Sequence, residues 1–295
     1  MQRRIDFIQE LVSRGGPEVS DYKALNICFR EIGDLIRNGA LSPADLQSAW
    51  PLFGDVFHSL NTMQGFVITK PHGYAGDFEI IERIYQNWIS PHPHLANWDH
   101  FFHAQQAPQA VRNRKRYFLD LMKTCRNSRE EEFRVLNVGS GPARDVYEYL
   151  CHGRERLLFE CIDQDEKAIA YAKSLNRDFL HQVNFHQCNA LRFSSPHQFN
   201  LVWSAGLFDY LSDRAFKVLL KRLLRSVRPQ GQLVIGNFST DNSSRDYMEF
   251  GHWFLEHRCE STLVALAMAC GVTPKSITIG REPEGVNLFL HIKRD

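Results

Sequence analysis

The segment RVLNVGSGPARD, from Arg134 to Asp145, constrains the fold of this chain more than any other feature of its sequence. Its first five residues have the hydrophobic pattern of a strand, and a glycine turn then leads into a helical pattern near Ala143. Closely spaced glycines let the backbone approach a ligand without a Cβ in the way, and a helix start adds unpaired N–H groups at the same place. The segment therefore predicts a strand, a turn and a helix that bind a nucleoside-bearing cofactor.

The rest of the C-terminal part continues this pattern as an α/β fold. Strand candidates alternate with helical patterns, and they lie at 135–138, 157–162, 183–187, 199–204 and 232–237. This alternation predicts a doubly wound, mostly parallel sheet with helices on both faces. The last two apolar runs, 276–279 and 286–292, are separated by the turn sequence REPEG, so we expect them to pair antiparallel at one edge of a seven-stranded sheet.

The N-terminal part is predicted to be all helical. Ser42 and Asp77 are expected to cap helices, Pro51 to bend one, and the segment PHPH (91–94) to form a loop before a helix that Pro108 opens. We therefore divide the chain into a helical cap or substrate-binding region, 1–130, and a Rossmann-like cofactor-binding domain, 131–295.

The composition argues against several classes of function. Lys and Arg (35) nearly balance Asp and Glu (34), so no nucleic-acid partner is expected. The seven cysteines are scattered and odd in number, which is typical of a reduced, cytoplasmic protein. The longest apolar stretch, 262–270, is too short to cross a bilayer, so no membrane insertion is expected. The oligomeric state is not indicated.

The residues that follow each strand are the candidate ligand contacts, because ligands lie at the carboxyl ends of parallel strands. Asp163 lies about 20 residues beyond the glycine turn, where a carboxylate accepts hydrogen bonds from both ribose hydroxyls, while Asp165 is the better candidate for a helix cap. A pyrophosphate-binding loop needs a third glycine where this chain has Arg144, which argues against a dinucleotide. An ordinary strand-to-helix turn remains the alternative for this segment.

The pattern G-x-G-x-A after a hydrophobic strand resembles the first motif of class I methyltransferases, which use S-adenosylmethionine. In many of these enzymes the position of Asn189 is an Asp that contacts adenine, and small residues after the fourth strand let the sulfonium and the acceptor approach. A polar turn and a plain strand end remain alternatives at these two places. The cofactor residues implied in the sheet domain are Gly139, Ser140, Gly141, Asp163, Gln164, Asn189, Ala190, Ser204, Ala205 and Gly206.

Four longer segments, KPHGYAGDFEIIERIY, VRNRKRYFLDLM, LNVGSGPARDV and SAGLFDYLSD, together resemble the bacterial methyltransferases that make 3-hydroxypalmitic acid methyl ester, an extracellular signalling factor. The resemblance covers nearly the whole chain, although His72 stands where Arg is expected. It implies a helical cap, with Tyr74 and Arg114 near the methionine end of the cofactor. An Arg suits bidentate binding of a carboxylate, and a solvated helix face is the alternative for Arg114 and its basic neighbours.

The acceptor is expected to contact the helical region and the segment after the fifth strand. The spacing predicts that Glu249, His252 and Trp253 lie on neighbouring turns of a helix. The candidate catalytic residues are His252, Tyr74 and Tyr210. Core packing for Trp253 and a surface role for His252 are the alternatives. The candidate substrate-binding residues are Tyr74, Asp77, Phe208, Tyr210, Asn237, Tyr247, Trp253 and Arg258.

Metal and hydrolase chemistry are weakly indicated. His92, His94, His100 and His103 lie close together without a Cys or carboxylate at ligand spacing, so no metal site is predicted. Neither Ser140 nor Cys188 lies in a G-x-S-x-G motif.

The sequence therefore predicts an S-adenosylmethionine-dependent methyltransferase that acts on a small molecule, with O-methylation of a fatty or other small acid as the leading hypothesis. N-methylation of a small amine or amino acid is the alternative. A nicotinamide oxidoreductase and a non-enzymatic cofactor-binding regulator are less favoured, the former because of Arg144.

Overall fold

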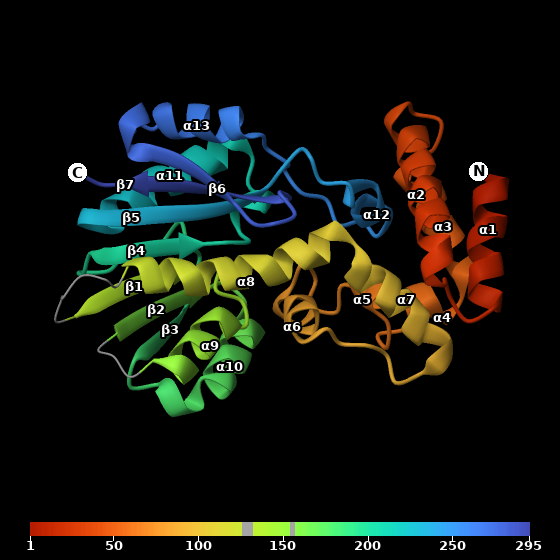
Figure 1. Cartoon of the computed structure of the whole chain (residues 1–295), viewed down its shortest axis with the longest axis horizontal. Helices are drawn as coiled ribbons and strands as arrows, with labels where there is room; N and C mark the ends of the chain where they lie inside the picture. The colour runs from red at the N-terminus through yellow and green to blue at the C-terminus, as the bar shows by residue number, and fades with distance from the viewer. Residues whose placement is uncertain (126–131, 154–156) are drawn as a thin grey trace. The chain divides into compact units, whose positions relative to one another are not determined.

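The computed structural model describes residues 1–125, 132–153 and 157–295, which form two compact units (Figure 1). We call residues 1–109 with 242–254 the helical unit, and residues 110–241 with 255–295 the sheet unit. The predicted boundary between 130 and 131 lies outside the described residues, so that division stays a prediction.

The sheet unit contains, in its described residues, one seven-stranded sheet of order β3-β2-β1-β4-β5-β7-β6. The first five strands are parallel, and β7 pairs antiparallel with both β5 and β6. The predicted doubly wound sheet and the predicted antiparallel edge are thus confirmed. The strands are β1 (Phe133–Val138), β2 (Leu157–Asp163), β3 (Val183–Gln187), β4 (Phe199–Ser204), β5 (Val227–Phe238), β6 (Ile277–Arg281) and β7 (Asn287–Lys293).

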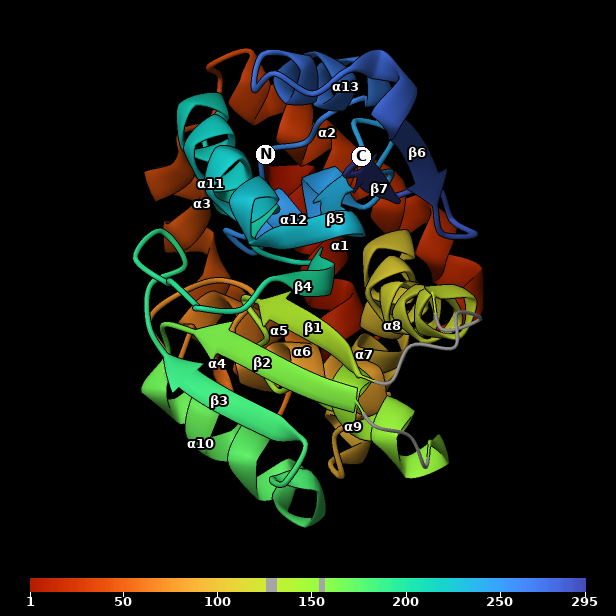
Figure 2. The same ribbon diagram turned by 90° about the vertical axis from the view of Figure 1, so that its left-hand side faces the viewer.

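Helices cover both faces of this sheet (Figure 2). The apolar side chains of α11 and α13 pack on one face, and those of α8, α9 and α10 pack on the other. The helices are α8 (Gln106–Cys125), α9 (Arg144–His152), α10 (Glu166–Leu175), α11 (Asp213–Ser226) and α13 (Glu260–Met268), with short 3-10 turns η3 (Arg177–Phe179), η4 (Phe208–Tyr210) and η5 (Pro274–Ser276).

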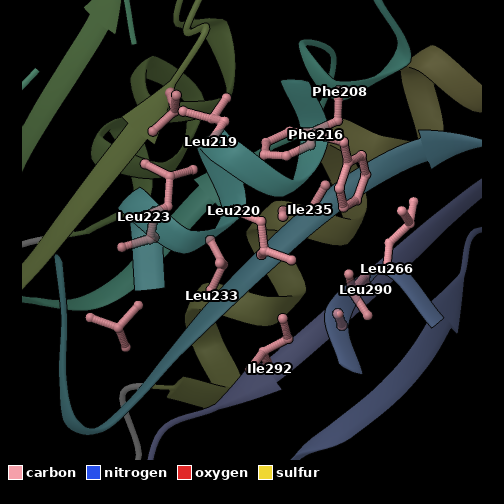
Figure 3. Packing of buried hydrophobic residues seen from close by; sticks show 14 of the residues in the cluster. Phe208, Phe216, Leu219, Leu220, Leu223, Leu233, Ile235, Leu266, Leu290 and Ile292 are labelled. Atoms are coloured by element: carbon pink, nitrogen blue, oxygen red, sulfur yellow. The ribbon is translucent and has the colours of Figure 1, made fainter. Parts of the chain in front are cut away.

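The two cores follow from the periodicity of the sequence. In β5, Leu233 and Ile235 point into the core with α11, whereas Val234 between them belongs to the opposite core, as the two-residue repeat of a strand requires. In α11, Phe216 and Leu220 meet this sheet face because residues four apart share one side of a helix (Figure 3). The site described below therefore rests on a sheet packed from both sides.

The helical unit is built from short helices whose starts carry the expected caps. Ser42 accepts a hydrogen bond from the backbone of Asp45, and the Asp77 carboxylate accepts from the backbone of Glu79 and Ile80, so both predicted caps are confirmed. The elements are α1 (Gln2–Ser13), η1 (Val19–Asp21), α2 (Tyr22–Arg37), α3 (Pro43–Ala49), η2 (Trp50–Phe53), α4 (Asp55–His58), α5 (Met63–Thr69), α6 (Phe78–Gln86), α7 (Pro93–Ala104) and α12 (Arg245–Phe250).

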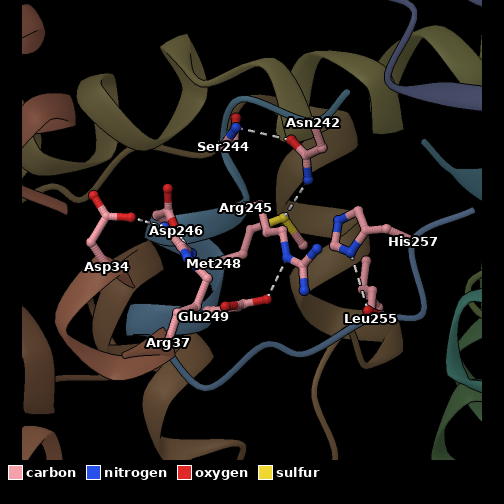
Figure 4. A network of polar contacts seen from close by, with 10 residues as sticks. All are labelled: Asp34, Arg37, Asn242, Ser244, Arg245, Asp246, Met248, Glu249, Leu255 and His257. Carbon is pink, nitrogen blue, oxygen red and sulfur yellow. Dashed lines mark hydrogen bonds and ion pairs between the residues drawn. The ribbon is translucent and has the colours of Figure 1, made fainter. Parts of the chain in front are cut away.

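The segment 242–254 belongs to the helical unit although it follows β5 in the chain. Asp246 on α12 pairs with Arg37 on α2, and Arg37 also binds Asp34 at 2.8 Å (Figure 4). The Asp246 carboxylate lies so close to Gly33 that a Cβ there would be 2.2 Å from an oxygen. A side chain at position 33 would therefore displace the Asp246 carboxylate and disturb its pairing with Arg37.

Three local predictions for this unit were wrong. Only the first half of the Pro/His segment, 91–92, lies outside a helix, because Pro93 occupies the first turn of α7, where a missing N–H costs no hydrogen bond. The helix that begins at Pro43 ends at Ala49, and the next four residues, with Pro51, form a 3-10 turn. The helix expected to carry His252 ends at Phe250. In the residues that the structure describes, no helix is long and apolar enough to cross a membrane.

Replacing Leu220 by Ala is expected to lower the free energy of unfolding by about 2–5 kcal/mol, because it leaves a cavity between α11 and the sheet. Urea denaturation followed by circular dichroism measures this loss. Val218→Ala on the same helix, where the side chain is exposed, should change stability by less than about 0.5 kcal/mol. Equal losses in both variants would contradict the assignment of the core face.

Candidate functional site

The glycine turn after β1 is held by hydrogen bonds to the end of β2. Gly139 and Gly141 have φ angles of 66° and 51°, a region that glycine enters without a steric cost. The N–H groups of Gly139 and Ser140 donate to the Ile162 carbonyl at 2.9 and 3.1 Å. The Gly141 N–H donates to the Asp163 carboxylate at 2.8 Å. The turn is therefore fixed to the carboxyl end of the neighbouring strand.

Asp163 is engaged through both carboxylate oxygens. One oxygen accepts from Gly141, and the other accepts from the Asp165 N–H at 3.0 Å. Burial raises the pKa of Asp163, and these backbone hydrogen bonds oppose that rise. Asp165 caps α10 by accepting from the Lys167 N–H at 2.8 Å, as expected. The contact of Asp163 with ribose stays a prediction.

Two features of the turn fit a ligand. The Ser140 hydroxyl oxygen is buried and has no hydrogen-bond partner among the described residues, which is costly unless a ligand supplies one. A Cβ added to Gly141 would meet no described atom within 4 Å, so the space beside this glycine is open. A nucleoside-bearing group placed there would lie beside the open glycine and near the hydroxyl, so the turn fits the cofactor that the sequence predicts.

The residues after β4 bring Arg114 to the same end of the sheet. The Ser204 hydroxyl is buried and donates to the Val138 carbonyl at 2.9 Å, which joins β4 to β1. The Arg114 guanidinium lies against Gly206, where a Cβ would be 3.0 Å from Nη1, and it donates to the Ala205 carbonyl at 3.4 Å. At 8% exposure, Arg114 does not lie on a solvated helix face.

The residues after β3 are more open to solvent. Asn189 and Gln164 are exposed, and their amides are 3.5 Å apart. The Asn189 side-chain oxygen accepts from the Leu191 N–H at 2.9 Å, which is the geometry of a polar turn. Ala190 is partly buried against the core. Contacts of these residues with adenine stay predictions.

Several predicted acceptor residues of the sheet unit have partners within that unit. Arg258 donates to the Asn237 side-chain oxygen at 2.8 Å and to the Phe208 carbonyl at 3.2 Å, and it pairs with Asp213 at 2.9 Å. Asn237 is fully buried, and Phe208 packs edge to face on Phe216. These contacts support the loop after β4 from inside. Tyr210, by contrast, is 42% exposed.

The remaining predicted acceptor residues lie in the helical unit. Tyr74 is 40% exposed, whereas the carboxylate of Asp77 caps the N-terminus of α6. Tyr247 packs against Phe29 and Phe101, with ring centroids 4.8 and 5.2 Å apart, and Trp253 is buried. The core-packing alternative therefore describes the environment of Trp253.

His252 combines a strained backbone conformation with a partly buried imidazole. Its φ angle of 53° is a strained conformation for a non-glycine residue, and its carbonyl accepts from Lys70 Nζ at 2.9 Å. The imidazole contacts Trp50 edge to face at 4.6 Å, and Nδ1 lies 3.4 Å from the Gln47 amide nitrogen. Burial, aided by the Lys70 charge, lowers the pKa of His252, so the imidazole is neutral at pH 7.

Two acidic residues of the site were missed by the sequence analysis. Asp145 and Asp209 lie at the ends of the segments RVLNVGSGPARD and SAGLFDY, which were chosen for their glycines and small residues. Burial raises the pKa of both carboxylates, and the charge of Arg114 opposes this rise without cancelling it. The signal that could have found them is an acid directly after each ligand-facing turn. Across the described ranges, no three His, Cys, Asp or Glu side chains are arranged to hold a metal.

Comparison with known proteins is consistent with this geometry. Residues 135–231, which include the glycine turn and the residues after β4, match the family described as a methyltransferase domain. No curated protein has a significantly similar sequence.

Solved structures resemble this chain at low sequence identity. A possible exported protein from Bordetella parapertussis has a TM-score of 0.62 and 14% identity, over 99% of this chain and 96% of that one. The magnesium protoporphyrin IX methyltransferase of Synechocystis PCC 6803 has a TM-score of 0.50 and 11% identity, over 64% and 87%. A Burkholderia thailandensis 1,6-didemethyltoxoflavin-N1-methyltransferase has a TM-score of 0.48 and 19% identity, over 66% and 85%.

The sheet unit has a class I, Rossmann-like methyltransferase fold, and residues 135–231 within it match the methyltransferase-domain model. The predicted fold class and the predicted class of enzyme, an S-adenosylmethionine-dependent methyltransferase, are therefore confirmed.

Asp163→Asn is expected to weaken the binding of S-adenosylmethionine at least about tenfold, or ~1.4 kcal/mol, because an amide NH₂ would replace one acceptor oxygen. Isothermal titration calorimetry measures the change. Asp165→Asn is the matched control, since Asn caps a helix as well as Asp does. Unchanged affinity in Asp163→Asn would remove this residue from the cofactor site.

Proposed function

We propose that this methyltransferase transfers a methyl group to the carboxylate of a small or fatty acid. The observation that carries the donor side is the turn after β1, where an open Gly141, an unpartnered Ser140 hydroxyl and the Asp163 carboxylate lie together. The acceptor side rests on the chemistry of Lys70 and His252 in the helical unit.

Different residues of the sheet unit bind different parts of the cofactor. Asp163 binds the ribose hydroxyls, and Arg114 binds the methionine carboxylate, which its buried guanidinium suits. Gln164, Asn189 and Ala190 contact the adenine. The bound cofactor supplies a methyl group on a sulfonium, which is already activated for displacement.

A carboxylate acceptor agrees with the side chains around His252. A carboxylate is ionised at neutral pH and needs no general base, so the enzyme has only to hold it in line with the methyl group. The Lys70 ammonium lies beside His252 and offers a positive charge to such an acceptor. Tyr74 and Tyr210 are exposed aromatic side chains that serve to position it.

N-methylation of a small amine is a second candidate, and one observation favours it. The lowered pKa of His252 keeps the imidazole neutral at pH 7, so it is able to accept the proton that an amine loses. O-methylation of a carboxylate has no use for this property.

The resemblance of four segments supports a further assignment, to the family that makes 3-hydroxypalmitic acid methyl ester. We also infer a cytoplasmic enzyme with a small-molecule partner and no nucleic-acid partner, because the seven cysteines, all within the described residues, are free and the charges are balanced. The division into a helical cap, 1–130, and a cofactor-binding domain, 131–295, is proposed on the same resemblance.

Calorimetry with S-adenosylmethionine and with NAD tests the donor assignment. Binding of the former in the micromolar range and no binding of NAD is expected, because the turn carries Arg144 in place of the third glycine. Binding of NAD alone would overturn the assignment and favour an oxidoreductase.

The acceptor assignment predicts an alkali-labile product. The protein is incubated with methyl-labelled cofactor and a pool of small acids and amines, and the labelled product is treated with base. A methyl ester releases its label, whereas an N-methyl group does not. Release supports the carboxylate acceptor, and an alkali-stable label would establish the second candidate instead.

His252→Ala is expected to lower turnover at least about tenfold while changing cofactor affinity less than twofold, since the imidazole acts on the acceptor. Steady-state rates and calorimetry measure the two quantities. His58→Ala, at an exposed position of the same unit, is the control. A fall in melting temperature with equal losses of turnover and cofactor affinity would show that His252 only supports the fold.

A further inference from the structure

Lys70 and His252 are two strained residues of the helical unit that contact each other. Lys70 follows α5 with a φ angle of 49°, and His252 follows α12 with a φ angle of 53°. The Lys70 Nζ donates to the His252 carbonyl at 2.9 Å, although the two residues are 182 positions apart. Left-handed backbone is unfavourable for residues other than glycine, and such strain clusters at ligand-binding and catalytic sites. The side chains around this pair were therefore searched for unpaired groups.

The Lys70 ammonium is a partly buried charge without an acidic partner. Burial lowers the pKa of Lys70, because the ammonium is partly removed from water. Its hydrogen bond goes to a neutral carbonyl, and no acidic side chain in the described part of the chain forms an ion pair with it. A partly buried cation in this position is stabilised by an anionic ligand.

The imidazole of His252 has one nitrogen in use and one without a partner. The Gln47 side chain presents its amide nitrogen, which is a donor, to Nδ1 at 3.4 Å. In the neutral ring, Nδ1 then accepts this hydrogen bond, and the ring proton is on Nε2. Nε2 is buried and has no hydrogen-bond partner among the described residues. Its N–H is therefore a donor that a ligand can use.

Trp50 provides a second unpaired donor beside this one. Its indole packs edge to face on the imidazole of His252, with ring centroids 4.6 Å apart. Trp50 is 7% exposed, and its Nε1, which can only donate, is buried without a hydrogen-bond partner in the ranges that the structure describes. A buried donor left unpaired is costly, so both nitrogens favour a ligand that accepts hydrogen bonds. Lys70 Nζ, His252 Nε2 and Trp50 Nε1 are thus all donors.

We propose that Lys70, His252 and Trp50 form a binding site for the carboxylate of the acceptor, in which the imidazole donates a hydrogen bond and does not act as a base. This inference rests on the proposed function. It adds Trp50 as a ligand-contacting residue and Gln47 as the positioning residue that fixes the tautomer of His252. Each oxygen of a carboxylate accepts hydrogen bonds, so one carboxylate can use all three donors. An amine in its ammonium form would face donors and the Lys70 charge, so the site selects acids over amines.

The same site distinguishes the substrate from the product. Methylation converts the carboxylate into an uncharged ester, so the attraction to the Lys70 ammonium is lost. Hydrogen bonds to an ionised acceptor are about twice as strong as those to a neutral one, so the bonds from His252 and Trp50 weaken as well. The ester therefore leaves the site more readily than the acid does.

Nuclear magnetic resonance of the full chain, labelled with nitrogen-15 in its histidine and tryptophan side chains, tests the two unpaired donors. The shifts of the two ring nitrogens report the tautomer of a histidine, and the signals are assigned with His252→Gln and Trp50→Phe. At neutral pH and without ligand, the expected result is a proton on Nε2 of His252. A proton on Nδ1 would overturn the inference, because Nε2 would then be able to act as a base.

Hexanoate and hexylamine, which have equal chain lengths and opposite charges, are the ligand probes. Hexanoate is expected to shift the signals of His252 Nε2 and Trp50 Nε1, whereas hexylamine is not. Methyl hexanoate, the corresponding ester, is expected to bind at least about tenfold more weakly than hexanoate. The indole of Trp88, whose ring centroid lies 4.5 Å from the Arg83 guanidinium carbon, is the internal control and should not shift.

Variants of the site test its members one by one. Lys70→Met is expected to weaken hexanoate binding at least about tenfold, because it removes both a donor and the charge. Trp50→Phe should weaken it at least about threefold, and since Phe retains an aromatic ring against His252, this variant tests the N–H alone. Lys23→Met, at an exposed position of α2, is the control and should not change the affinity.

The absence of shifts with hexanoate, or equal shifts with hexylamine, would overturn this inference, and the alkali-lability assay decides the proposed function separately. Unchanged hexanoate affinity in Lys70→Met and Trp50→Phe would remove both residues from the site. Hexanoate binding together with an alkali-stable methylated product would instead overturn methyl transfer to the acid, while the acid-binding site itself would stand.

Discussion

The hydrogen bond from the Gly141 N–H to the Asp163 carboxylate, at 2.8 Å, is the interaction on which the candidate site depends. It joins the turn that follows β1 to the residue that ends β2, and the bonds from Gly139 and Ser140 to Ile162 reinforce it. Because the turn uses positive φ angles, it needs such fixed partners to keep one shape. The same contacts leave the Ser140 hydroxyl buried and without a partner among the described residues.

Much of the sheet unit could be predicted from the sequence. Parallel strands buried on both faces produce continuous apolar runs, and the helices between them keep a 3.6-residue repeat, so Leu136, Leu201 and Leu220 all fell in predicted elements. The sequence also distinguished Asp165 from Asp163, and the structure confirms that Asp165 caps α10. These features are local, and local patterns are what a sequence displays.

The features that sequence analysis missed depend on contacts between distant residues. A proline both ends and begins helices, so Pro93 gave no sign of α7 without its buried neighbours Leu95 and Trp98. Beyond the end of α12 at Phe250, the carbonyl of the strained His252 accepts a hydrogen bond from Lys70, which is 182 residues away. The sequence also does not distinguish the environments of the two buried arginines, Arg114 and Arg258. Arg258 is enclosed by carbonyl and carboxylate groups, whereas Arg114 faces a glycine.

The strand order has a consequence for how the chain is made. β5 is a long strand inside the sheet, and one of its edges is covered by β7 (Asn287–Lys293), which follows the six other described strands in the chain. During synthesis, that edge stays unpaired until β7 has left the ribosome, and an unpaired apolar edge invites association with other chains. Loss of β7 would therefore expose the middle of the sheet, although every residue assigned to the cofactor site would still be present.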